Sequence, residues 1–190
     1  WYAAIIFILN FMTGGQIVYG LEFLETEPQY MCLNKTTKIW EDCEKETICD
    51  NKLNYPSEWK IDYDAEKSYR NWVDPDKLDL TCDSDTLIGS IASSYFIGFA
   101  LSAPIIPPLG DRIGRKYPYL GSLALQSLAY NLIIISKNVY WVLGYYIVVG
   151  LCAGGRVAVG VCYMTEFLPE KYHNITITLL NCGDASIMIF

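Results

Sequence analysis

Gly110-Asp111-Arg112-Ile113-Gly114-Arg115-Lys116 is a short, net-basic stretch that separates two long uncharged ones. Residues 86–109 before it and 117–136 after it contain no Asp, Glu, Lys or Arg. Each is long enough, at about 20 residues, to cross the apolar core of a bilayer as a helix. Because basic residues beside a span favour the cytoplasmic side, the pattern predicts a tight cytoplasmic turn at 110–116 between two transmembrane helices.

The rest of the chain divides in the same way. Three further apolar stretches predict transmembrane helices at 1–21, 139–165 and, as the start of a fifth helix, 174–190. Lys137 and Asn138 form a very short outer turn, and residues 166–173 form a second cytoplasmic turn. We therefore expect an all-α integral membrane protein of about five transmembrane helices. The chain has no initiator Met and starts and ends inside apolar stretches, so we expect a fragment of a longer protein.

Small residues repeat at helical spacing within two of these predicted spans. They occur at every fourth position in 86–109 and again in 139–165: Ser90, Ser94, Gly98, Ser102, Gly150 and Gly154. Such stripes let transmembrane helices approach closely. Three prolines near the end of the predicted span 86–109 are expected to kink or end it: Pro104, Pro107 and Pro108.

Residues 22–85 form a long acidic segment between the first two spans. It holds 17 acidic and 8 basic residues, whereas the whole chain has a net charge of −7. Four cysteines allow three disulfide pairings: Cys32, Cys43, Cys49 and Cys82. Together with the glycosylation sequon at Asn34, they favour an extracellular or lumenal loop. Trp40, Trp59 and Trp72 are expected to form a small core beneath the disulfides.

Polar residues inside the spans are the candidates for a substrate cavity, because polar groups in lipid normally face a protein interior. We single out Asn10, Gln16, Arg156, Tyr163, Asn181 and Asp184. Arg156 and Asp184 are expected at matched depth, near the bilayer midplane, on consecutive antiparallel helices. They are therefore predicted to pair, either as a structural ion pair or as part of a functional site.

Asp111-Arg112-Ile113-Gly114-Arg115-Lys116 resembles the D-R-x-G-R-K loop between the second and third spans of major facilitator superfamily transporters. Pro107 stands where that family usually has Gly. Glu166-Phe167-Leu168-Pro169 resembles the E-x-x-P segment after the fourth span, with His173 where Arg is usual. The cysteine-bearing outer loop, closing on Thr81-Cys82-Asp83, is similar to that of the organic cation and organic anion transporter branch.

The resemblance implies a twelve-helix transporter of two lobes that moves a small organic solute by alternating access. This chain would supply about five helices of the N-terminal six-helix lobe, in the plasma membrane or an endomembrane. The motif residues Asp111, Arg112, Gly114, Arg115, Lys116 and Glu166 would control its conformation. Among them, Asp111, Arg115 and Glu166 would form a cytoplasmic charge cluster. The expected partners are the lipid bilayer, a small organic solute, and the remaining lobe or other membrane subunits.

Two other functions remain open at this stage. A non-transporting membrane scaffold or subunit would explain the departures from the family motifs at Pro107, Tyr146 and His173. A claudin-like adhesion protein would also have a large cysteine-bearing outer loop, but a fifth span argues against it. No enzyme is indicated, because His173 has no nucleophile beside it, and no cofactor, metal or nucleic-acid site is predicted.

Overall fold

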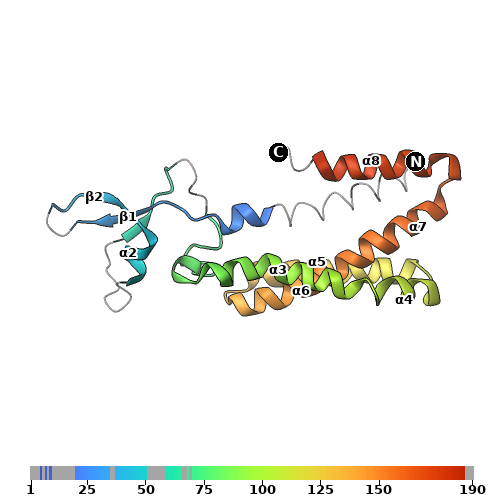
Figure 1. The fold of residues 1–190 in the computed structure, drawn as a ribbon, viewed down its shortest axis with the longest axis horizontal. Coiled ribbons are helices and arrows are strands. Elements are labelled where there is room, and N and C mark those ends of the chain that lie inside the picture. The colour runs from blue at the N-terminus through green and yellow to red at the C-terminus, as the bar shows by residue number, and fades with distance from the viewer. Residues whose placement is uncertain are drawn as a thin grey trace. The chain divides into compact units, whose positions relative to one another are not determined.

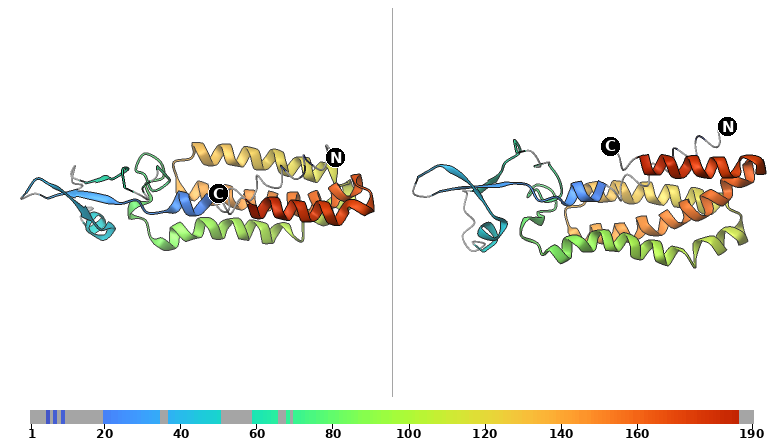
Figure 2. Two further views of the ribbon diagram at one scale, coloured as in Figure 1. Left: turned by 90° about the horizontal axis from the view of Figure 1, so that it is seen from above. Right: turned by 45° about the horizontal axis from the view of Figure 1, so that its top comes forward.

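The structure is a computed structural model that describes residues 5, 7, 9, 20–34, 37–50, 59–65, 68 and 70–186. The chain divides into two compact units (Figures 1 and 2). Leu21–Ile88 forms the sheet unit, and Trp1–Gly20 with Gly89–Phe190 forms the helical unit. The predicted first span at 1–21 lies almost wholly outside the described residues.

The sheet unit is built on a small antiparallel sheet that the sequence analysis did not predict. Its strands β1 (Tyr30–Leu33), β2 (Trp40–Cys43) and β3 (Trp59–Ile61) lie in the order β2-β1-β3. Tyr30 pairs with Cys43 on one side and with Ile61 on the other. The helix α2 (Lys45–Asp50) and the short 3₁₀ helix η1 (Leu80–Cys82) complete the unit.

The core of the sheet unit differs from the expected cluster of three tryptophans. Tyr30, Ile48 and Ile61 are its buried residues, and Trp59 packs against them with its ring 5.9 Å from that of Tyr30. Trp40 is instead exposed, and the Lys60 ammonium lies 4.6 Å from the centre of its ring. Trp40 is on an edge strand, where a cation stacked on the ring stabilises it without burial.

Two disulfides close the sheet unit, Cys32–Cys43 and Cys49–Cys82. The first joins the paired strands β1 and β2, and the second joins α2 to η1. They span sequence separations of 11 and 33 residues. In the chain-entropy description the longer loop contributes about 1 kcal/mol more to stability than the shorter one. Cys49–Cys82 is therefore the stronger constraint on the segment.

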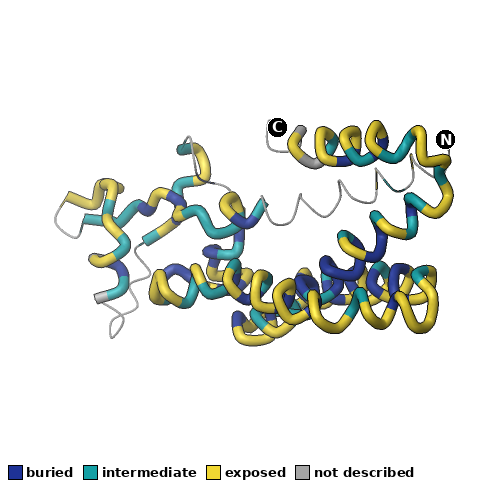
Figure 3. The backbone as a smooth tube through the Cα atoms, turned by 45° about the vertical axis from the view of Figure 1, so that its right-hand side comes forward, coloured by how far each residue is buried: buried dark blue, intermediate teal, exposed yellow. Residues whose placement is uncertain are grey.

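The helical unit follows as a series of helices with short connections. They are α3 (Asp85–Ser102), α4 (Ile106–Ile113), α5 (Lys116–Ile135), α6 (Val139–Gly154), the π-helix η2 (Gly155–Val159), α7 (Gly160–Phe167), the 3₁₀ helix η3 (Glu170–Tyr172) and α8 (His173–Ser186). Among the described residues, two helical stretches are long and apolar enough to cross a membrane: α5 and the continuous Val139–Phe167. Buried and exposed residues alternate along these helices (Figure 3).

The predicted span at 86–109 is broken rather than straight. α3 ends at Ser102, and α4 begins at Ile106 with a bend of 40° between them, so the pair counts as a third candidate span only if both parts belong to one crossing. Pro107 and Pro108 lie in the first turn of α4, where a missing N–H costs nothing. The prolines therefore start a new helix, which carries residues 110–113 of the predicted turn.

The stripes of small residues bring α3 and α6 into backbone contact. A Cβ placed on Gly98 would overlap the carbonyl oxygen of Ile147, and one on Gly150 would overlap that of Tyr95. Gly154 in turn lies against the side chain of Ser102. The same positions that recur every fourth residue in the sequence thus form the α3–α6 interface.

Candidate functional site

An ion-paired cluster lies where α4, α5 and α7 end or begin. Arg115 Nη1 lies 3.1 Å from Glu166 Oε1, and Arg115 Nη2 lies 3.6 Å from Asp111 Oδ1. All three side chains are partly exposed, and Arg115 is the least exposed of them, with 32% of its side-chain surface open to solvent. We call Asp111, Arg115 and Glu166 the charge cluster. It links two helices that are about 50 residues apart in the chain.

Local structure explains how Arg115 comes to bridge the two carboxylates. Gly114 ends α4 with a φ of 88°, a conformation that residues with a Cβ resist. The reversal places Arg115 at the start of α5, one helical turn after Asp111. Gly110 of α4 lies beside Val159 of η2. Arg112 and Lys116 are exposed and form no salt bridge within the described part of the chain.

Arg156 lies in the interior of the helical unit. It belongs to the π-helix η2 and is 6% exposed. The π-helix packs against α5, where Gly155 lies against the side chain of Ser122. Single turns of π-helix within α-helices frequently lie at functional sites, so the π-helix makes Arg156 a candidate functional residue.

One face of α5 presents polar groups toward η2, which the sequence analysis did not single out. Tyr119, Ser122 and Gln126 are buried there, and Gln126 Nε2 donates a hydrogen bond to the Tyr130 hydroxyl. Their positions repeat every three or four residues, which places them on one helical face. That spacing of polar residues in an otherwise apolar span is the signal that could have identified them.

Tyr163 belongs to an aromatic group on α7. Its ring centre lies 5.9 Å from that of Tyr119, 5.7 Å from Phe7 and 4.8 Å from Phe167. Gly160 lies directly against the Tyr119 ring. The aromatic group therefore adjoins the polar face of α5.

The other predicted cavity residues are placed only in part. Asn181 is exposed on α8, and Asp184 lies on the same helix but its side chain is not described. The predicted pair of Arg156 with Asp184 therefore stays a prediction. Asn10 and Gln16 lie outside the described residues.

In the sheet unit, the predicted cysteines all form disulfides, and Asn34 lies next to the β1–β2 turn. Its side-chain amide donates to both oxygens of the Glu41 carboxylate at 3.3 Å. The other two sequon positions lie outside the described residues, so glycosylation at Asn34 stays a prediction.

The helical unit contains helices of membrane-spanning length that pack through glycines and are linked by the charge cluster. These features define a polytopic integral membrane protein. A sequence model of the Major Facilitator Superfamily matches residues 78–190, and the chain belongs to this family. The family consists of transporters and not of enzymes. No solved structure matches the chain.

Several curated transporters are similar to about half of the chain. A niacin transporter of Acinetobacter baylyi is 37% identical over 92 residues, which are 48% of this chain and 21% of the relative. A gentisate transporter of Corynebacterium glutamicum is 32% identical over 53% of this chain and 22% of its own length. Human solute carrier family 22 member 2 is 27% identical over 50% of this chain and 17% of its own. The chain thus spans about a fifth of the length of these relatives.

Proposed function

We propose that this chain is part of the first six-helix lobe of a transporter that moves a small organic ion by alternating access. Membership of the Major Facilitator Superfamily supports a transport function. The names of two relatives, transporters of niacin and gentisate, support a small organic ion as the solute. The remaining lobe would complete the pathway.

The observation that carries the proposal is the bridge from Arg115 to both Asp111 and Glu166. Alternating access requires contacts that hold one state and break in the other, and an ion pair can serve as such a contact. A partly exposed pair stabilises one state by only about 0–1 kcal/mol, which is small enough for a solute to overcome. Arg112, Gly114 and Lys116 are assigned to the same conformational motif, with the turn on the cytoplasmic side.

The substrate path is assigned to the polar interior of the lobe. Arg156 and Tyr163 are its best-supported members, because the first is a buried cation and the second adjoins an aromatic group. Asn10, Gln16, Asn181 and Asp184 are proposed to complete the path. The sheet unit is assigned to the extracellular or lumenal side, which suits its two disulfides.

Charge reversal in the cluster tests the proposal. In the full-length protein, Arg115→Glu places three carboxylates together, and we expect uptake into proteoliposomes to fall about fivefold, the equivalent of about 1 kcal/mol. The double variant Arg115→Glu with Glu166→Arg restores opposite charges and is expected to recover much of the loss. Radiolabelled nicotinate and tetraethylammonium serve as one anionic and one cationic test solute.

Lys137→Glu is the matched control, since Lys137 is an exposed cation of the outer turn. We expect it to transport as the parent does. If the full-length protein inserts normally yet transports neither solute nor any other small organic ion tried, the scaffold function replaces the transporter function. If Arg115→Glu transports like the control, the charge cluster has no role in transport.

A further inference from the structure

The sheet unit contains a cavity of about 910 Å³. Its walls come from three places: the segment that enters β1, the junction of β2 with α2, and the turn from η1 into α3. Cavities that hold small organic ligands measure roughly 300–1,000 Å³. The volume therefore suits a small solute. Both disulfides hold the walls together, and three of their four cysteines line the cavity: Cys43, Cys49 and Cys82.

The lining of this cavity is strongly acidic. Six carboxylates face one basic side chain, Lys45. Two of the six, Glu27 and Asp85, bind Lys45, whereas the other four form no ion pair within the described part of the sheet unit: Asp42, Glu44, Glu46 and Asp83. A cavity lined by one sign of charge concentrates ions of the opposite sign. The expected occupant is therefore cationic.

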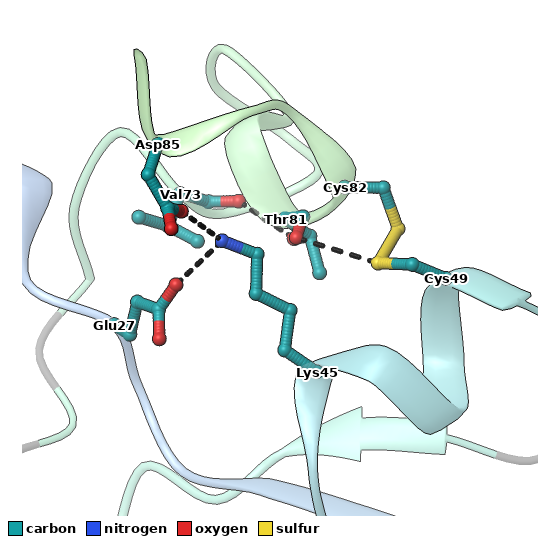
Figure 4. Close-up of a disulfide and its surroundings, with 7 residues drawn as sticks. All are labelled: Glu27, Lys45, Cys49, Val73, Thr81, Cys82 and Asp85. Carbon is teal, nitrogen blue, oxygen red and sulfur yellow. Dashed lines mark hydrogen bonds and ion pairs between the residues drawn. A yellow bond between two sulfur atoms is a disulfide. The ribbon is translucent and has the colours of Figure 1, made fainter. Parts of the chain in front are cut away.

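The cavity already holds one ammonium group, which belongs to the chain itself. Lys45 Nζ lies 2.6 Å from Glu27 Oε1 and 3.1 Å from Asp85 Oδ1 (Figure 4). Burial alone would lower the pKa of Lys45, but the hydrogen bonds to Glu27 and Asp85 outweigh it and raise that pKa. The two carboxylates are 50% and 92% exposed, so the pair is weak and open to competition from a second ammonium.

A buried hydroxyl gives an independent indication of a ligand. Tyr30 lines the cavity and is only 5% exposed, yet its hydroxyl has no hydrogen-bond partner among the described residues. Thr81 interacts with this hydroxyl, but its own proton is donated to the Val73 carbonyl at 3.0 Å (Figure 4). Thr81 can therefore only accept from Tyr30, and the lone pairs of the Tyr30 oxygen stay open to an N–H donor. Buried polar groups are normally paired. Burial also raises the pKa of Tyr30, so the neutral hydroxyl has lone pairs to accept from an N–H donor.

A metal ion fits this arrangement less well than an amine. No group of three or more His, Cys, Asp or Glu side chains in the described ranges is placed to hold a metal ion. A calcium ion needs six to eight oxygen ligands at about 2.3–2.6 Å, whereas the carboxylates here are spread around a wide cavity. An elongated amine can reach several of them in turn.

We propose that this cavity binds a small organic amine through its protonated nitrogen, with the Tyr30 hydroxyl and the acidic lining as acceptors and Lys45 as a competing internal ammonium. The residues that line the site belong to the sheet unit, which includes the first turn of α3 from Asp85 to Ile88. The site gives the protein a second place at which it recognises an organic cation.

The test is the binding of 1,4-diaminobutane to the full-length protein in phosphatidylcholine nanodiscs, measured by isothermal titration calorimetry. Glu44→Gln combined with Asp83→Asn removes two acceptors and is expected to weaken binding about fivefold or more. Tyr30→Phe is expected to weaken it about threefold. Lys45→Met frees Glu27 and Asp85 and is expected to strengthen it about twofold to fivefold. This gain distinguishes the proposal from unfolding, which would only weaken binding.

Asp64→Asn is the matched control, because Asp64 is an exposed carboxylate of the same unit that does not line the cavity. It is expected to leave the affinity unchanged. The proposal is overturned if diaminobutane does not bind, or if the cavity variants bind it as Asp64→Asn does. Tetraethylammonium, which has no N–H donor, and calcium are compared through the same variants, because either ion could also bind elsewhere in the full-length protein. If Glu44→Gln with Asp83→Asn weakens their binding as much as that of diaminobutane, the cavity attracts charge alone and the proposal is overturned.

Discussion

Replacing Gly98 by Leu is expected to lower the yield of folded protein at least about tenfold. Gly98 of α3 lies against the backbone carbonyl of Ile147, and a side chain there would overlap main-chain atoms that cannot move aside within a helix. Overpacking a well-packed site costs about 1–3 kcal/mol and sometimes more. Because the obstacle is backbone, the cost is expected at the upper end. Gly150→Leu should behave alike, since Gly150 meets Tyr95 of α3 in the same way.

Each helix supplies its own control for this experiment. Gly89 of α3 and Gly144 of α6 have no atom within 4 Å of the position that a Cβ would take. Gly89→Leu and Gly144→Leu change helix propensity and apolar area as the test variants do, but create no overlap. Monodisperse yield on size-exclusion chromatography is the measurement. Equal yields for all four variants would show that α3 and α6 do not meet at these glycines.

Replacing Arg156 by Gln is expected to reduce uptake by the full-length protein about 30-fold or more. Arg156 is 6% exposed within the π-helix η2, which packs against α5. Truncating one partner of a buried charge interaction costs about 2–5 kcal/mol. If Arg156 lines the substrate path, the loss appears mainly as a raised KM in uptake kinetics. Arg156→Lys keeps the charge without the planar fork and should retain part of the activity.

A purely structural role for Arg156 would give a different pattern. The folded yield of Arg156→Gln would then fall while KM for the surviving protein stayed at the parent value. Lys137→Gln, which removes an exposed cation from the outer turn, is the control for nonspecific charge effects. Wild-type uptake and KM in Arg156→Gln would remove this residue from the substrate path.

Two of the helices could be predicted from the length of their apolar stretches alone. The uncharged stretch 117–136 corresponds to α5, Lys116–Ile135, and 139–165 corresponds to the continuous helix Val139–Phe167. The family, predicted from the D-R-x-G-R-K and E-x-x-P resemblances, is confirmed by the match over residues 78–190. Both signals are local in sequence, which is why they can be read without a structure.

The break between α3 and α4 was predicted only in part from the sequence. Prolines were expected to kink or end the predicted span, and they also begin the next helix, because Pro107 and Pro108 suit its first turn. The π-helix at Gly155–Val159 has no comparable signal. Its sequence is compatible with an ordinary α-helix, so the π-helix could not be predicted from the sequence.

The disulfide connectivity and the pairing of the strands could not be predicted from the sequence. Four cysteines permit three connectivities, and only the fold of the sheet unit selects Cys32–Cys43 and Cys49–Cys82. The antiparallel sheet was missed because its strands are three or four residues long and half of β2 is charged, at Glu41 and Asp42. The cavity beside Tyr30 likewise depends on residues that lie far apart in sequence.

In the proposed membrane topology, the sheet unit and the charge cluster lie on opposite sides of the bilayer. A membrane-impermeant maleimide tests it in cells that express the full-length protein with either Asp64→Cys or Arg112→Cys, both at exposed positions. The parent protein measures the background from its free cysteines, which include Cys152, Cys162 and Cys182. We predict that Asp64→Cys labels in intact cells and that Arg112→Cys labels only after permeabilisation. Labelling of both variants in intact cells, or of neither, would contradict the account.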